Sequence, residues 1–265
     1  MQKIFIEDSW KSVLAANGMK TFEDFYHNEN KTCINRNQKR NVSRIKLNTD
    51  AGEKTFYLKR FRNSHFKDTL FTFLNTGKFM SQAGYEWSNM KLLEKNNIGV
   101  PNCICYGEDV PFGLERQSFM ITLELNKQCF TDFVNQNWAS LPQDEKEKII
   151  IALAGTLSKI HKIGIGLTDL YVWHIYISKT EKGDYDFAFI DLNRMKRNCY
   201  GQSERMKNLG RLLFSMQENY FDKSLRRLLI ETYAEEMKFK DIEALIRRVK
   251  RFSKKYKARK KFPPY

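Results

Sequence analysis

The chain has 265 residues, of which 42% are hydrophobic and 14% aromatic, with 13 glycines and 5 prolines. This composition excludes disordered and collagen-like chains and predicts one large domain, or one domain of two lobes, with a packed core. The 46 lysines and arginines outnumber the 31 acidic residues, and the net charge of +15 favours an anionic partner such as nucleic acid, phosphate or acidic lipid.

The cysteines and the first residues of the chain favour a cytoplasmic protein. The five cysteines form no CxxC pair, so we interpret them as reduced thiols and expect neither zinc nor a disulfide framework. Residues 1–18 carry Glu7, Asp8 and Lys11 where a signal peptide would be apolar, and no stretch reaches about 18 uninterrupted apolar residues. We therefore expect neither secretion nor a membrane span.

The first half of the chain alternates β-rich runs with turns. Residues 42–48 and 55–61 are rich in branched and aromatic side chains and predict a hairpin. Residues 83–95 have helical periodicity, and residues 100–106 and 118–125 predict two more strands. This half therefore predicts an antiparallel sheet with one inserted helix.

The second half is predicted to be mainly helical. From Leu141 onward, apolar residues recur at three- and four-residue steps, and only residues 174–177 and 187–190 interrupt this pattern with a small hairpin. We place the boundary between the lobes near residues 126–132. The prediction is an α+β fold with an N-terminal lobe, 1–127, and a C-terminal lobe, 128–265.

Four charged residues occupy positions where a charge without a partner or a function would be energetically costly. Asp169 follows a long helix, Asp191 ends an apolar strand, and Lys59 lies in the middle of a strand. Glu86, on the following helix, is a suitable counter-ion for this lysine. A phosphoryl-transfer enzyme needs such a set: one Asp as base, one to hold Mg²⁺, and a Lys on the phosphates. Taken singly, Asp169 is better explained as a turn-capping residue and Asp191 as a solvated strand end, but the order of all four residues favours the enzyme.

Longer segments carry a family resemblance. YLKRF at 57–61, AGYEWSNMKLLEKNNIGVP at 83–101, IHKIGIGLTDLYVWHIYIS at 160–178 and FIDLNR at 189–194 resemble the lipopolysaccharide kinases, the Kdo and heptose kinase group of Gram-negative bacteria. That family is itself similar to eukaryotic-type protein kinases in fold. The resemblance implies a two-lobed, protein-kinase-like fold.

The same resemblance implies roles for individual residues. Asp169 would be the catalytic base, Asp191 the Mg²⁺ ligand, and Lys59 with Glu86 the ion pair that orients the ATP phosphates. His174, five residues after the base, stands where protein kinases have a metal-binding Asn and would lie on the metal or phosphate side.

The chain departs from the protein-kinase pattern in two places. Leu167 and Thr168 replace the His-Arg that precedes the catalytic Asp in many kinases, which suggests an enzyme that is not switched by activation-loop phosphorylation. A glycine-rich phosphate loop is also missing, so the basic turn 35–40 is expected to cover the nucleotide. Backbone groups from Glu124 to Asn126 are candidates for binding adenine, with an ordinary sheet strand as the alternative.

The C-terminal segment concentrates the excess charge. Residues 238–261 contain twelve basic and two acidic residues, and apolar residues of 241–256 share one helical face. Such a helix could rest on the anionic inner face of the inner membrane or pack on the C-terminal lobe with a solvated basic face. Nucleic-acid binding is not expected, because no DNA- or RNA-binding motif accompanies the charge.

Together with the charged residues, the resemblance implies an ATP- and Mg²⁺-dependent kinase that phosphorylates a Kdo or heptose hydroxyl of the lipopolysaccharide inner core, with the core or a lipid A precursor as its substrate. Two alternatives remain open at this point. One is a kinase with a protein or another small alcohol as its acceptor. The other is a catalytically silent scaffold that binds an anionic membrane surface.

Overall fold

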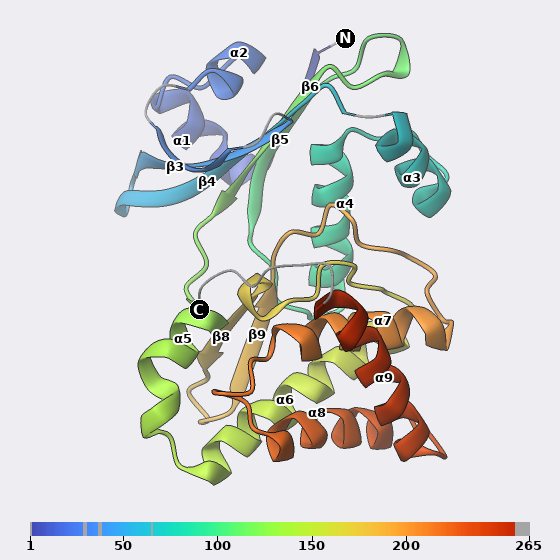
Figure 1. The fold of residues 1–265 in the computed structure, drawn as a ribbon. Helices are drawn as coiled ribbons and strands as arrows, with labels where there is room; N and C mark the ends of the chain where they lie inside the picture. The colour runs from blue at the N-terminus through green and yellow to red at the C-terminus, as the bar shows by residue number, and fades with distance from the viewer. Residues whose placement is uncertain (1, 29–30, 37–38, 65, 258–265) are drawn as a thin grey trace. The chain divides into compact units, whose positions relative to one another are not determined.

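The computed structural model describes residues 2–28, 31–36, 39–64 and 66–257, and the chain forms two compact units (Figure 1). The first unit comprises Met1–Leu92 and Pro101–Leu125. The second comprises Leu93–Val100 and Asn126–Tyr265. The short segment 93–100 thus belongs with the second unit although it lies between two parts of the first.

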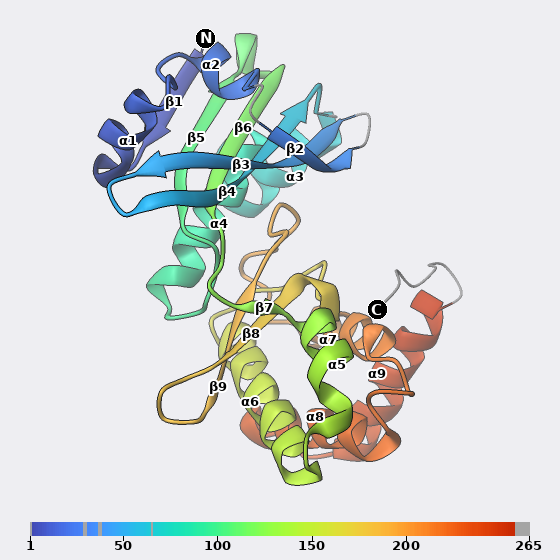
Figure 2. The same ribbon diagram turned by 90° about the vertical axis from the view of Figure 1, so that its left-hand side faces the viewer.

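The first unit is built on a six-stranded antiparallel sheet, seen from the side of its α1 helix in Figure 2. The strand order is β1-β5-β6-β4-β3-β2. The predicted hairpin is confirmed as β3 and β4, joined by a tight turn that ends at Gly52 with φ +94°. The strands are β1 (Gln2–Ile6), β2 (Lys31–Arg36), β3 (Arg40–Thr49), β4 (Gly52–Arg62), β5 (Cys103–Asp109) and β6 (Gln117–Leu123).

The two faces of this sheet have different coverings because successive side chains of a strand point to opposite faces. Phe56 and Leu58 of β4 are fully buried in a core with residues of the helices α1 (Lys11–Ala16) and α2 (Phe22–Tyr26). Lys59 lies on the other face, toward α4 (Gln82–Lys95).

Helices are more numerous in this unit than the sequence predicted. The predicted helix at 83–95 is α4, but α1, α2 and α3 (Phe66–Thr76) are additional, as is the strand β1 that pairs with β5. The expected nucleotide-covering turn at 35–40 runs from the end of β2 into β3, and its tip, 37–38, lies outside the described residues.

The second unit combines a three-stranded sheet with five longer helices in its described part (Figure 1). The predicted hairpin is confirmed as β8 and β9, which form a sheet of order β7-β8-β9. The α+β class is therefore confirmed. The elements are β7 (Gln128–Cys129), α5 (Phe130–Asn137), α6 (Gln143–Lys162), β8 (Ile175–Lys179), β9 (Tyr185–Phe189), α7 (Gln202–Ser215), α8 (Lys223–Glu236) and α9 (Ile242–Lys257). Short 3₁₀ turns occur at Asp8–Trp10, Pro111–Gly113, Trp138–Ser140 and Val172–His174.

Gly99 fixes the end of β9 within this unit. Its carbonyl accepts a hydrogen bond of 2.9 Å from the N–H of Phe189, and a Cβ at this position would lie 2.3 Å from the carbonyl oxygen of Phe187. Only a glycine lets the two backbones approach this closely. The contact holds the strand that leads directly into Asp191.

The basic C-terminal helix packs on the second unit. Leu245, Ile246 and Val249 of α9 are buried, and a Cβ at Gly210 of α7 would lie 2.6 Å from the Cβ of Phe252. The opposite side of α9 is exposed and cationic, with Arg247, Arg248, Lys250, Arg251, Lys254 and Lys255. Within the described residues, none of the helices combines the length and the apolar composition that crossing a membrane requires.

Candidate active site

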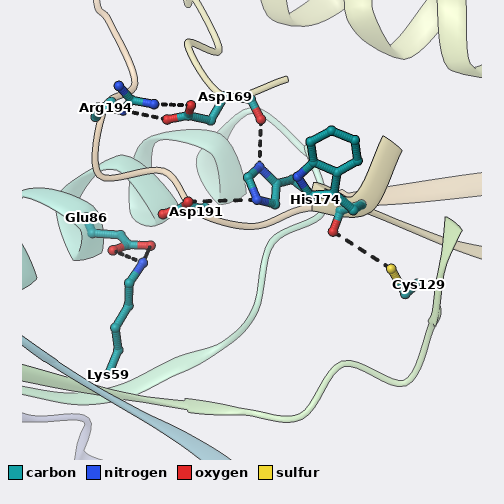
Figure 3. Close-up of polar contacts among 8 residues, drawn as sticks. Lys59, Glu86, Cys129, Asp169, His174, Asp191 and Arg194 are labelled. Atoms are coloured by element: carbon teal, nitrogen blue, oxygen red, sulfur yellow. Dashed lines mark hydrogen bonds and ion pairs between the residues drawn. The ribbon is translucent and has the colours of Figure 1, made fainter. Parts of the chain in front are cut away.

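A buried ion pair joins the sheet and the helix α4 in the first unit (Figure 3). The Nζ of Lys59 donates to both carboxylate oxygens of Glu86, at 2.7 Å and 2.6 Å. The side chain of Glu86 is 1% exposed and that of Lys59 is 13% exposed. Because a buried charge is expensive without a partner, each side chain holds the other in place. The predicted pairing of Lys59 with Glu86 is thus present, with the ammonium group kept at a fixed point above the sheet.

Asp169 lies in the second unit and pairs with an arginine (Figure 3). The Nε of Arg194 donates to Oδ2 of Asp169 at 2.7 Å, and Nη2 donates to Oδ1. The carboxylate is buried, whereas the side chain of Arg194 is 57% exposed. Burial lowers the pKa of Arg194, but its hydrogen bond and attraction to Asp169 outweigh this effect, so that the pKa of the guanidinium is raised overall.

His174 connects Asp169 with Asp191. Its Nδ1 lies 2.8 Å from the backbone carbonyl oxygen of Asp169, and its Nε2 lies 3.9 Å from Oδ2 of Asp191. A carbonyl oxygen can only accept, so Nδ1 carries a proton. The imidazole is thus fixed by the backbone of Asp169, and its Nε2 faces the Asp191 carboxylate.

Asp191 has an unusual backbone conformation at the end of β9. Its φ is +57°, in the left-handed region that costs an L-residue about 1–2 kcal/mol and that Asp tolerates better than most. The N–H of Ile190, one residue earlier, donates to the carbonyl of His174 at 3.0 Å. The sharp turn places the carboxylate among the residues that line a small hollow with Asp169 and His174.

The segment that carries Asp169 is anchored by a buried polar network. Oδ1 of Asn208 accepts from the N–H of Leu167 at 2.7 Å and lies 3.2 Å from Nε2 of His161. Because that oxygen is an acceptor, Nε2 of His161 donates, and its Nδ1 accepts from the hydroxyl of Tyr233 at 2.8 Å. Burial lowers the pKa of His161 to about 4, which keeps the ring neutral. His161 is therefore a fully buried structural histidine.

The adenine candidates lie at the junction after β6. The side chains of Glu124 and Asn126 are exposed, and the Glu124 carboxylate accepts from the hydroxyl of Tyr57 at 2.8 Å. The N–H of Glu124 donates to the carbonyl of Thr55 at 3.1 Å, which continues the pairing of the sheet. The hypothesis of adenine binding therefore depends on the Glu124 carbonyl and on Asn126.

The donor atoms of this site partly suit Mg²⁺. Mg²⁺ prefers oxygen and is commonly held by one or two carboxylates together with substrate phosphates. Asp191 supplies such a carboxylate, whereas His174 offers a nitrogen and has its other ring nitrogen engaged by the backbone. The described residues contain no group of three or more His, Cys, Asp or Glu that could hold a metal by themselves. Asp191 therefore fits as a ligand that shares the ion with the phosphates of a nucleotide.

Two residues of the site were not identified from the sequence. Arg194 follows Asp191 by three residues, but nothing in the local pattern indicates that its side chain reaches back to Asp169. Asn208 lies in the middle of α7, where a fully buried Asn is unusual and therefore marks a structural hydrogen bond. That burial could have been suspected from the apolar residues around it, whereas the Asp169–Arg194 contact depends on tertiary structure.

The chain is similar to known lipopolysaccharide kinases. A model of the family described as Lipopolysaccharide kinase (Kdo/WaaP) matches residues 24–251. The lipopolysaccharide core heptose(I) kinase WaaP of Pseudomonas aeruginosa is 23% identical over 203 residues, which cover 69% of this chain and 75% of that protein. The protein of the same name from Escherichia coli K12 is 24% identical over 206 residues, covering 71% and 78%.

A solved structure described as WaaP in complex with acyl carrier protein has the same fold. Its TM-score is 0.70 at 20% sequence identity, and the match covers 96% of this chain and 98% of that one. The kinase-like fold expected from the sequence is thereby confirmed. Since the family model spans most of the chain, the protein belongs to the lipopolysaccharide kinase (Kdo/WaaP) family and is a kinase.

Proposed function

We propose that this protein transfers the γ-phosphoryl group of ATP to a Kdo or heptose hydroxyl of the lipopolysaccharide inner core. The observation that carries the proposal is that Asp169, His174 and Asp191 line one small hollow, on a chain that belongs to this kinase family. The curated relatives named heptose(I) kinase favour heptose as the acceptor sugar.

Asp169 acts as the base in this mechanism. It orients the acceptor hydroxyl and takes its proton as the oxygen attacks the γ-phosphorus, while the bond from that phosphorus to the bridging oxygen breaks and ADP leaves. Each carboxylate oxygen of Asp169 accepts one hydrogen bond from Arg194 and keeps a further lone pair for the acceptor. Arg194 thus orients the carboxylate of Asp169 and leaves a lone pair on each of its oxygens for the acceptor hydroxyl.

The remaining groups hold the nucleotide. Lys59, fixed by Glu86, neutralises phosphate charge, and Asp191 would hold Mg²⁺ together with phosphate oxygens. When bound, the ion offsets negative charge that develops during transfer. His174 lies beside Asp191, with its Nε2 3.9 Å from Oδ2, and would face the metal or a phosphate, and Glu124 and Asn126 would supply backbone contacts to adenine.

The acceptor also implies where the protein works. Lipopolysaccharide is lipid-linked, so the kinase would act as a peripheral protein at the inner face of the inner membrane. The exposed cations of α9 would be attracted to anionic lipids there, each by about 1 kcal/mol near the surface. Since the apolar side of α9 is buried in the protein, this contact would be purely electrostatic.

The test compares Asp169→Asn with the wild type in transfer of labelled phosphate from ATP to core oligosaccharide. We expect the variant to lose at least about a hundred-fold in kcat, because it keeps the shape of Asp169 but not its basicity. Asp184→Asn, an exposed aspartate in the turn between β8 and β9, is the matched control and should retain full activity.

Mass spectrometry of the product then identifies the sugar. Phosphate on heptose or Kdo supports the proposal, whereas an unchanged phosphate count in the core from cells with and without the protein contradicts it. Turnover with a protein or another small alcohol alone would identify a different acceptor. A wild type that binds ATP but never transfers phosphate would instead be a scaffold.

A further inference from the structure

Helix α3 turns its apolar side chains toward solvent. Leu74 is 74% exposed, Phe66 69% and Phe79, just after the helix, 65%. The residues that α3 buries are instead threonines, Thr69 and Thr72. This is the reverse of the usual pattern for a helix on a globular protein, and exposed apolar patches of this kind mark interaction surfaces. We call Phe66, Leu70, Phe73, Leu74 and Phe79 the α3 patch.

The orientation of α3 is held by contacts on its buried side. The Thr72 hydroxyl donates to the carbonyl of Thr69 at 2.8 Å, which satisfies its polar atom inside the protein. Phe71 packs edge-on against Tyr85 of α4, with ring centroids 6.0 Å apart, and α3 lies beside α4 in this unit (Figure 1). The apolar face is therefore fixed outward.

The α3 patch is continuous across the turn that follows the helix. The rings of Phe73 and Phe79 stack with centroids 4.7 Å apart and an interplanar angle of 17°. Exposed lysines, Lys67 and Lys78, adjoin this surface. Long cationic side chains beside an apolar face are typical of helices that lie in a lipid interface, where the ammonium groups reach the phosphates.

Asn75 and Thr76, uncharged polar residues of α3, already form hydrogen bonds within the helix. Asn75 donates to the carbonyl of Phe71 at 2.8 Å, and the Thr76 hydroxyl donates to the carbonyl of Thr72 at 2.8 Å. Protein interfaces usually carry about one hydrogen bond per 100–200 Å², whereas the interior of a lipid layer requires none. A surface of phenylalanine and leucine flanked by lysine therefore suits lipid better than protein.

We propose that the α3 patch inserts into the surface of an anionic phospholipid bilayer. This inference rests on the proposed function in one respect, namely that a kinase with a lipid-linked acceptor must work at a membrane. The inserted side chains would reach about 5–10 Å into the boundary between headgroups and acyl chains. The patch adds a hydrophobic contact to the electrostatic one that α9 would provide.

The first experiment measures binding of the full-length protein to vesicles of phosphatidylethanolamine and phosphatidylglycerol that contain no lipopolysaccharide. Phe66→Glu and Leu74→Glu should each weaken binding about ten-fold, because each removes a large buried apolar side chain from the lipid contact. Ile151→Glu, at an exposed position of α6, is the matched control and should bind as the wild type does. Circular dichroism verifies that all variants are folded.

The second experiment measures insertion directly. Tryptophan fluorescence of Leu74→Trp should be quenched by brominated lipids beyond the background of the wild type, while that of Ile151→Trp should not. Unchanged vesicle binding of Phe66→Glu and Leu74→Glu, or absence of quenching at position 74, would overturn the proposal. If these two glutamate variants instead convert a dimer into a monomer with vesicle binding unchanged, the patch is a contact between two copies of the chain.

A third measurement separates this inference from the proposed function. The wild type and the Phe66→Glu/Leu74→Glu double variant are assayed with soluble, deacylated core and with core embedded in vesicles. If both proposals hold, the double variant loses turnover only with the embedded acceptor. If the function is wrong, the wild type acts on neither acceptor and the vesicle-binding result still stands. Equal turnover of both proteins on the embedded acceptor contradicts the α3 inference alone.

Discussion

The lysine–glutamate ion pairs of this protein differ greatly in burial, and burial determines how firmly each pair fixes its side chains. The Lys59–Glu86 pair is almost inaccessible, whereas the Lys46–Glu53 pair on the neighbouring hairpin leaves more than half of each side chain in solvent. An exposed pair contributes little, at most about 1 kcal/mol, because water screens it. The buried pair instead fixes an ammonium group at one position, which is what phosphate binding requires.

Replacement of Glu86 should therefore uncouple Lys59 from its position. We expect Glu86→Gln to lower kcat/KM for ATP about a hundred-fold, because a misplaced group near the reacting phosphates costs about that much. Glu53→Gln makes the same chemical change in the exposed pair and should alter neither activity nor melting temperature. Steady-state kinetics and thermal unfolding of both variants provide the measurement. Equal activities of Glu86→Gln and the wild type would contradict the role assigned to the pair.

Arg194 is predicted to position Asp169 rather than to touch the substrate. Arg194→Gln should lower kcat about ten-fold with little change in KM for ATP, because the carboxylate loses its bidentate partner but remains able to accept a proton. Arg194→Lys should restore activity only in part, since an ammonium group cannot form both hydrogen bonds in the plane of the carboxylate. Arg44→Gln, at an exposed position of β3, is the control. If Arg194→Gln instead loses activity because it unfolds, its melting temperature will be lowered, and this result would contradict a positioning role.

The imidazole of His161 connects three helices of the second unit through hydrogen bonds. His161 near the end of α6 bonds to Asn208 of α7 and Tyr233 of α8, and Asn208 also holds the backbone of Leu167. The segment that carries Asp169 is thus fixed to the packing of the helices. A charged imidazole would leave the Tyr233 hydroxyl without its acceptor in a fully buried site, so the network is stable only with His161 neutral.

This network should make the stability of the protein depend on pH. The pKa of His161 is lowered to about 4 in the folded protein, against its ordinary value of about 6.5 when unfolded. Between these values only the unfolded state binds the proton, so stability falls as the pH decreases. The loss between pH 7 and pH 5 is about 2 kcal/mol. In denaturant unfolding, the free energy of unfolding of His161→Gln should lack this part of the pH dependence. The free energy of unfolding of the control His27→Gln, at an exposed position, should retain it.

Elements with a clear periodicity were predictable from the sequence, and those that tertiary contacts determine were not. The β3–β4 hairpin, α4 and α6 were found because their apolar residues repeat at the period of a strand or a helix. Helices α1 and α2, of six and five residues, are too short for such a pattern. Helix α3 was not predicted, because it exposes its phenylalanines and leucines and buries threonines.

The contacts of the candidate site were likewise predictable from the sequence only in part. The pairing of Lys59 with Glu86 was predicted from the order of residues and from a family resemblance, and the structure contains it. The metal or phosphate role predicted for His174 stays a prediction, although the structure places its ring beside the Asp169 carbonyl and the Asp191 carboxylate. The link from Arg194 back to Asp169 was missed because it depends on the path of the chain after Asp191, whose φ of +57° no sequence pattern indicated. The order of residues along the chain predicts which side chains lie close together. It does not predict the backbone conformation of a turn, which decides where a side chain such as that of Arg194 points.

At the scale of the whole molecule, the net charge of +15 is concentrated in the C-terminal segment. The sequence left open whether α9 rests on a membrane or packs on the protein, and the structure shows that its apolar side is used for packing. The exposed cations remain available for long-range attraction to an anionic surface. The two proposed membrane contacts therefore differ in kind: the α3 patch is apolar, and α9 is electrostatic.

Salt should separate these two contributions. Neutralisation of Arg247, Arg251 and Lys255 to Gln should weaken binding to phosphatidylglycerol-containing vesicles about a hundred-fold at low ionic strength, since each cation contributes about 1 kcal/mol. The difference from the wild type should disappear as salt shortens the Debye length to about 3 Å at molar concentration. The loss caused by Leu74→Glu should persist in high salt, because hydrophobic insertion is not screened.

The matched control removes the same charge elsewhere. Neutralisation of Lys20, Arg44 and Lys54, which are exposed on the first unit, changes the net charge by an equal amount. If net charge alone governs attraction to the vesicle, both triple variants weaken binding equally and α9 has no special role. If α9 is the electrostatic contact, only its own neutralisation produces the large salt-dependent loss, because the attraction falls off within about one Debye length of the lipid surface.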